Sequence, residues 1–122
     1  MDVINTSGRR KSAVARIYLS KGKGKITINN KDQKDYFPLV ELQGKLAQPF
    51  AITENVGKYD VKVNVKGGGF KGQAEAIRLG ISKALVEIDP DYKPALRAEG
   101  LMTRDPRMVE RKKFGQPKAR KQ

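Results

Sequence analysis

The sequence predicts an α+β fold: a single two-layer domain, in which a mixed four-stranded sheet packs against helices, followed by an extended basic C-terminal tail. Short segments with apolar residues at every second position, separated by glycine-rich breaks, are typical of half-buried strands. One later segment repeats apolar residues every three to four positions, as an amphipathic helix does. The 122 residues suit one domain. We expect a compact domain at 1–103 and a basic edge strand and tail at 104–122.

Two predicted strands, joined by a glycine-rich turn, occupy the first part of the chain. Residues 12–19 alternate between a face of small and apolar side chains and a face that carries Arg16 and Tyr18. Residues 20–24 contain two glycines and suit a hairpin turn, and residues 25–29 then alternate again. On the polar face, Tyr18 can either stack on a nucleic-acid base or pack partly against its own strand.

Less regular sequence between residues 32 and 56 predicts two short helices. Asp32 can cap the first helix, which has to end before Pro38. Three leucines, spaced three and four positions apart, favour the second helix. We expect Gly44 and Pro49 to break that helix.

The clearest predicted strand is 59–66, in which apolar and polar residues alternate. Three glycines end this strand, and the apolar spacing then becomes helical after residue 72 and continues to residue 88. Residues 92–99 predict a short helix that Gly100 ends. Farther on, we expect a short edge strand near 107–112 and then an extension that is disordered without a partner.

Positive charge is concentrated at the two ends of the sequence. The chain has 26 Lys or Arg residues and 13 Asp or Glu residues, a net charge of +13. Residues 1–25 hold seven basic residues and one acid, and residues 104–122 hold eight and two, whereas residues 26–103 hold eleven and ten. Two cationic segments on a near-neutral domain favour a polyanionic partner, with nucleic acid first. A solubilising surface is the alternative.

The composition excludes several kinds of chemistry. Cysteine and histidine are both absent, which removes thiolate chemistry, the commonest general base and the commonest metal ligand. No apolar run approaches the roughly 20 residues that cross a bilayer. We therefore expect no cofactor, no metal, no small-molecule substrate and no membrane partner.

A glycine motif of the form G-x-G-x-x-G at 67–72 matches the spacing of a dinucleotide-binding loop between a strand and a helix. However, the helical spacing continues to residue 88, so Asp89 ends a helix and not a second strand. Lys66 and Lys71 flank the loop, so it suits an RNA phosphate as well as a nucleotide. A tight turn without a ligand is the alternative, and a small enzyme that binds a nucleotide here is a second hypothesis.

Three blocks of sequence resemble the bacterial small ribosomal subunit protein nine family. They are residues 8–16, residues 67–78, and residues 101–115 continued by 118–121. The blocks occur in the order of the family and span nearly the whole chain. The resemblance implies a fold like the second domain of small-subunit ribosomal protein five, with a left-handed crossover, and a place in the head of the small subunit. It also implies a C-terminal tail directed toward transfer RNA in the peptidyl site.

We therefore expect a structural constituent of the small ribosomal subunit that supports translation in the cytoplasm, and not an enzyme. Its expected partners are small-subunit ribosomal RNA, neighbouring head proteins and, through the tail, peptidyl-site transfer RNA. A nucleic-acid-binding protein that works outside the ribosome is a third hypothesis. The residues expected to bind RNA are basic or belong to the glycine loop: Arg9, Arg10, Lys11, Arg16, Lys21, Lys23, Lys66, Gly68, Gly69, Lys71, Arg104, Arg107, Arg111, Lys112, Lys113, Lys118, Arg120 and Lys121.

Overall fold

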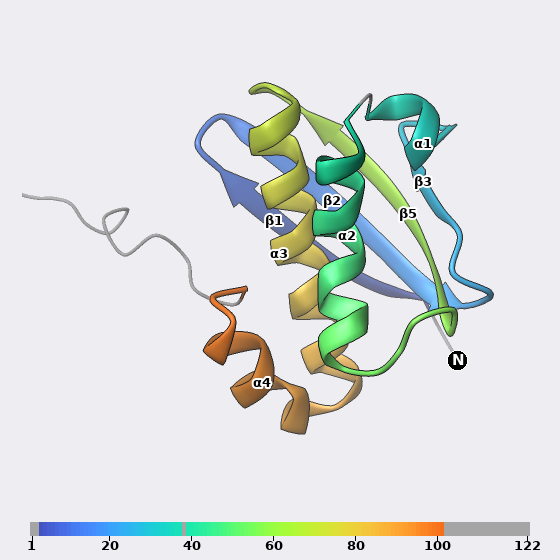
Figure 1. Ribbon diagram of the computed structural model, residues 1–122, viewed down its shortest axis with the longest axis vertical. Helices are drawn as coiled ribbons and strands as arrows, with labels where there is room; N and C mark the ends of the chain where they lie inside the picture. Colours follow the sequence, from blue (N-terminus) through green and yellow to red (C-terminus); the bar gives the residue numbers. More distant parts are fainter. Residues whose placement is uncertain (1–2, 38, 102–122) are drawn as a thin grey trace, which may run out of the picture.

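A computed structural model describes residues 3–37 and 39–101. These residues form a five-stranded sheet with its helices on one side (Figure 1). The strands follow the spatial order β1 (Ile4–Arg10), β2 (Ala13–Lys21), β5 (Tyr59–Lys66), β3 (Ile26–Ile28) and β4 (Lys31–Asp32). The β3–β5 pair is parallel and the other pairs are antiparallel. The predicted α+β fold with a mixed sheet is therefore confirmed.

The helices pack in a second layer over the buried face of the sheet. They are α1 (Gln33–Tyr36), α2 (Val40–Ile52), α3 (Phe70–Ile88), the 3-10 turn η1 (Pro90–Tyr92) and α4 (Lys93–Ala98). Helix α3 lies against β1 and β2, and α2 packs beside α3 (Figure 1). The core between the layers includes Ile17 and Val63 from the sheet and Ile77, Ile81 and Leu85 from α3. Within the described residues, no helix is both long and apolar enough to span a bilayer.

Three of the four predicted strands correspond to β2, β3 and β5, and the fourth, near 107–112, lies outside the described residues; the five described strands also include β1 and β4, which the sequence did not predict. Strand β1 forms the edge beside β2, and two of its residues, Thr6 and Gly8, face α3. The Thr6 hydroxyl donates a hydrogen bond of 2.7 Å to the carbonyl oxygen of Gly80. A Cβ atom on Gly8 would overlap the carbonyl oxygen of Ala76. Since α3 approaches so closely, Ile4 is the one large apolar residue of β1, and no alternation of apolar residues reveals the strand.

Helix α2 continues through the two residues that were expected to break it. Gly44 is exposed, where glycine costs only about 1 kcal/mol relative to alanine. Pro49 lies in the last turn, where its missing N–H removes one helical hydrogen bond, and its ring is buried. The prediction that these two residues break the helix is therefore wrong. The free-energy cost of a glycine or a proline depends on where in the helix it lies, and at these two positions the helix tolerates it.

The other predicted elements agree with the structure, apart from their ends. Helix α3 begins at Phe70 and not after Gly72, because the Gln73 N–H already donates to the Gly69 carbonyl oxygen at 2.9 Å. The strand expected near 107–112 lies outside the described residues.

Candidate nucleic-acid interface

The structure places two distant segments side by side at one end of the sheet. The turn between β1 and β2 carries Lys11 and Ser12, and the glycine loop follows β5. In the strand register, Val14 of β2 lies between Arg9 of β1 and Lys66 of β5. A Cβ atom on Gly67 would overlap the Ser12 carbonyl oxygen, so the loop backbone rests directly on the hairpin turn. Cations from both segments are thereby gathered at one end.

The backbone of the glycine loop has a conformation that favours glycine. Gly67 and Gly68 have φ angles of +83° and +62°, in the left-handed region that other residues rarely adopt. A Cβ atom on Gly68 would also lie 3.2 Å from the Cβ of Ala13. At Gly69 a Cβ would meet nothing within 4 Å, so packing does not require glycine there. Among the residues that the structure describes, no side chain caps the N-terminus of α3, and this end of a helix favours anions.

Three polar residues that the sequence analysis missed hold the loop in place. The Gln73 amide donates to the Gly67 carbonyl oxygen at 3.0 Å and accepts from the Tyr36 hydroxyl at 2.7 Å. Asn29 exchanges two hydrogen bonds with the backbone of Val65, at 2.9 and 3.0 Å. The sequence gives one sign of this arrangement: Gln73 lies on the inward face of a helix, where an apolar residue is usual.

An ion-pair network ties the hairpin to both large helices. Glu75 of α3 accepts from the Arg10 guanidinium at 2.8 Å and from the Lys45 ammonium of α2 at 3.0 Å. Partial burial raises the pKa of Glu75, but the hydrogen bonds from Arg10 and then Lys45 outweigh it and hold this pKa below its ordinary value of 4.5. The network fixes the Arg10 guanidinium against Glu75 of α3.

The face of the sheet turned away from the helices is basic; we call it the open face. Alternation along β1, β2 and β5 points Arg9, Arg16, Lys62 and Lys66 to this side, and all four are exposed. Arg16 and Lys66 line a common hollow together with Val14, Asn29, Asn64 and Val65. The alternation predicted for 59–66 already turned Lys62 outward, although it was not among the expected RNA-binding residues.

Among the residues of β1, β2 and β5 that face the open side of the sheet, Asp60 is the one acidic residue. Its Oδ1 atom accepts backbone hydrogen bonds from Lys23, Gly24 and Lys25 at 2.9, 3.2 and 2.9 Å. These bonds lower the pKa of Asp60 below its ordinary value of 3.8, and the bond from Lys25 has the largest effect. The carboxylate is thus directed at the turn after β2.

The predicted RNA-binding residues divide into four groups. Seven form what we call the loop cluster: Arg9, Arg10, Lys11, Lys66, Gly68, Gly69 and Lys71. Arg16 lies nearer the middle of the open face. Lys21 and Lys23 lie at the other end of β2, roughly 25 Å away for a strand of nine residues. The tail residues lie outside the described residues: Arg104, Arg107, Arg111, Lys112, Lys113, Lys118, Arg120 and Lys121.

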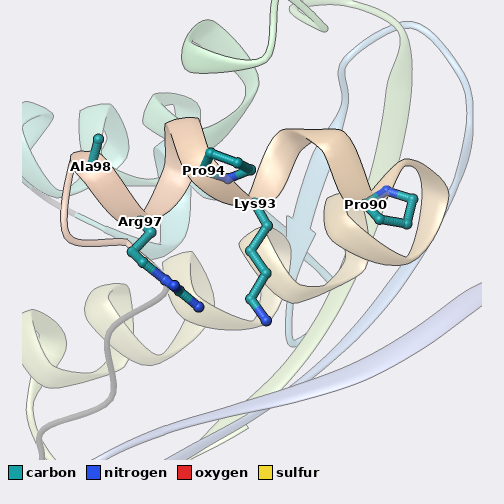
Figure 2. A pocket seen from close by; sticks show the side chains of 5 residues that line it. All are labelled: Pro90, Lys93, Pro94, Arg97 and Ala98. Atoms are coloured by element: carbon teal, nitrogen blue, oxygen red, sulfur yellow. The ribbon is translucent and has the colours of Figure 1, made fainter.

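A further basic pair, not singled out in the sequence, lies on α4. Figure 2 shows Lys93 and Arg97 one helical turn apart, extending in the same direction beside a hollow that Pro90, Pro94 and Ala98 also line. Since α4 follows the C-terminal end of the 19-residue helix α3, this pair is separated from the glycine loop by roughly 28 Å of helix.

The glycine loop does not belong to a dinucleotide-binding fold. Strand β5, which precedes it, is antiparallel to β2, and α3 is followed by η1 and α4 and by no further strand within the described residues. A dinucleotide fold requires a parallel strand after that helix. In the same part of the chain, no group of three or more Asp or Glu side chains is placed to hold a metal ion.

A small α+β domain with an uncovered basic sheet face and a cationic loop cluster is typical of nucleic-acid-binding proteins. The family model described as ribosomal protein S9/S16 matches residues 8–122. The small ribosomal subunit protein uS9 of Christiangramia forsetii is 62% identical over 99% of this chain and 94% of its own length. Those of Porphyromonas gingivalis and Amoebophilus asiaticus are 61% and 56% identical over the same shares. The chain belongs to the ribosomal protein S9/S16 family.

Family membership confirms the resemblance found in the three sequence blocks. Proteins of this family are structural components of the ribosome and not enzymes, in agreement with the expectation from the sequence. Ribosomal RNA and other ribosomal proteins are the partners that such a family implies, and bacterial ribosomes are cytoplasmic.

Proposed function

We propose that the chain is a structural constituent of the small ribosomal subunit, which binds small-subunit ribosomal RNA in the head through the loop cluster. The relatives cited above are small-subunit proteins and cover nearly the whole chain, which supports this assignment. Neighbouring head proteins are proposed as further partners, and residues 104–122, with eight basic residues, as a tail directed toward peptidyl-site transfer RNA.

The observation that carries the proposal is the grouping of cations within the loop cluster. Five basic residues, from segments more than fifty positions apart in sequence, lie at the end of the sheet that carries the glycine loop: Arg9, Arg10, Lys11, Lys66 and Lys71. The nearby acid, Glu75, pairs with Arg10 and Lys45, so these three groups together still carry one net positive charge. Such an arrangement favours the crowded phosphates of folded RNA.

The affinity of this surface for RNA is expected to depend steeply on salt, because each phosphate contact releases counterions. Replacing both Lys66 and Lys71 by glutamine should weaken binding to a head fragment of small-subunit ribosomal RNA. It should also reduce the slope of log affinity against log salt by about 0.7 to 0.9 per lost contact. Fluorescence anisotropy over a salt series measures both quantities.

The control is Lys58→Gln, which removes one positive charge, where the double variant removes two, from an exposed position before β5, away from the glycine loop, so the effects are compared per charge removed. Equal slopes for the double variant and the wild type would contradict the proposed site. Co-sedimentation with small subunits across a salt gradient then separates a ribosomal constituent from a nucleic-acid-binding protein that works elsewhere.

A further inference from the structure

We propose that a hollow beside Tyr18, on the open face, takes one unstacked nucleotide of single-stranded RNA, with the base stacked on the Tyr18 ring and the phosphate near Lys25 and Lys62. The proposal rests on the RNA-binding function above, and it adds a site outside the loop cluster. Tyr18 pairs with Lys62 and Val14 pairs with Lys66, so the two sites are separated by roughly 13 Å along β2.

The residues around this hollow match the parts of a nucleotide. Tyr18 supplies an aromatic surface, and Val3, which is 58% exposed, adds an apolar one. Lys25 and Lys62 supply positive charge, and nearby hydroxyl groups can bond a ribose. The full lining is Val3, Tyr18, Ser20, Lys25, Thr27, Asp60, Val61 and Lys62.

Packing within the protein does not account for Tyr18. The sequence has four tyrosines, and Tyr36, Tyr59 and Tyr92 all pack against the hydrophobic core, whereas Tyr18 does not. It stands on the open face between Asn5 of β1 and Lys62 of β5. Among the described residues, its hydroxyl has no hydrogen-bond partner. A half-buried ring without a core contact is available to a ligand.

The acid at the edge of the hollow orders the turn that carries Lys25. Asp60 Oδ1 accepts the backbone N–H groups of Lys23, Gly24 and Lys25. These three bonds hold the turn that brings Lys25 to the hollow, and they direct positive backbone dipoles at the carboxylate. The lining of the hollow therefore holds two positive charges, from Lys25 and Lys62, against the one negative charge of Asp60.

Single-stranded RNA fits this site better than duplex RNA does. A base inside a duplex is already stacked and cannot lie on a side chain, whereas an unpaired base can be placed on an aromatic ring of an open sheet. Stacking of this kind tolerates any base, and the neighbouring cations follow the backbone. The net charge of +13 favours this polyanion over a protein partner.

A tryptophan substituted at this position provides a direct test, because the chain contains no tryptophan. In the full-length Y18W variant, titration with a single-stranded hexamer of oligoadenylate RNA should quench the indole fluorescence until it saturates. The matched control is Y92W, which places the indole against the core near α4, where the hexamer should leave the fluorescence unchanged. A blunt RNA duplex should quench neither variant.

Two further variants connect the stacking to affinity. Tyr18→Ala should weaken hexamer binding by about fivefold or more, whereas Tyr18→Phe, which keeps the ring, should bind within twofold of wild type. If anisotropy shows salt-dependent binding but Y18W is not quenched, or is quenched no more than Y92W, the nucleotide site is wrong and the loop cluster stands. If neither the hexamer nor the head RNA fragment binds, both proposals fail together.

Discussion

Gly8 shows how a single residue controls the distance between two layers. Its missing side chain lets the β1 backbone approach the α3 backbone, where the carbonyl oxygen of Ala76 and the amide nitrogen of Gly80 line the contact. The Thr6 hydroxyl then reaches the Gly80 carbonyl oxygen. Because these neighbours are helix backbone, they cannot rotate away from an added methyl group.

We therefore expect Gly8→Ala to reduce the free energy of unfolding by about 2–3 kcal/mol, in the range found for overpacked cores. Urea unfolding followed by circular dichroism measures the loss. The control is Ser7→Ala, in which the exposed neighbouring side chain is shortened and the stability should change by less than about 0.5 kcal/mol. A comparable effect of the two substitutions would show that β1 does not depend on close approach to α3.

At the scale of elements, helix α2 contains a glycine, Gly44, that destabilises the helix and that packing does not require. Gly44 is exposed, lies in the interior of the helix, and a Cβ added there would meet nothing within 4 Å. Alanine at this position restricts the unfolded chain and costs nothing in the folded one. Gly44→Ala should raise the free energy of unfolding by about 0.5–1 kcal/mol, measured by the same urea titration.

The contrasting variant is Gly68→Ala, in the loop that precedes α3. There φ is +62° and the added Cβ would lie 3.2 Å from the Cβ of Ala13, so we expect a loss of about 1 kcal/mol or more. If both substitutions changed stability in the same direction, the local backbone would not be the cause.

Helices and strands whose own apolar residues repeat with a regular spacing were predictable from the sequence. Strands that form only because they pack or pair with another element were not. Strands 12–19 and 59–66 and the helix ending at 88 bury their own large side chains, so the spacing of those side chains is visible. Strand β1 instead presents Thr6 and Gly8 to α3, and this choice is understandable only once α3 is in place. The short strand β4 likewise depends on β3, with which it pairs over two residues.

At the scale of the whole molecule, the composition of the candidate site was predictable but its geometry was not. Charge and the glycine motif identified Arg9, Lys11, Lys66 and Lys71. Their convergence depends on the pairing of β2 with β5, two strands that lie far apart in the sequence, so no short stretch of sequence shows it. The same register separates Lys21 and Lys23 from the loop cluster, so residues that are alike in sequence occupy different ends of the molecule.

The network around Glu75 joins three elements, so its protonation should affect the stability of the whole domain. Arg10 on β1 and Lys45 on α2 both pair with this carboxylate on α3, and the pKa of Glu75 is lowered. A carboxyl group with a lowered pKa stabilises the fold above its unfolded-state pKa, near 4.5, and this contribution is lost as the pH falls through the folded-state value.

Glu75→Gln should therefore cost about 1–2 kcal/mol of unfolding free energy at pH 7, allowing for the partial exposure of the pair. The difference from wild type should shrink as the pH falls below about 4.5. Urea titrations at pH 7, 5 and 3.5 measure it, with Glu87→Gln, an exposed glutamate on the same helix, as the control. A deficit that is as large at pH 3.5 as at pH 7 would mean that the side chain acts through packing, because only the charged pair disappears on protonation.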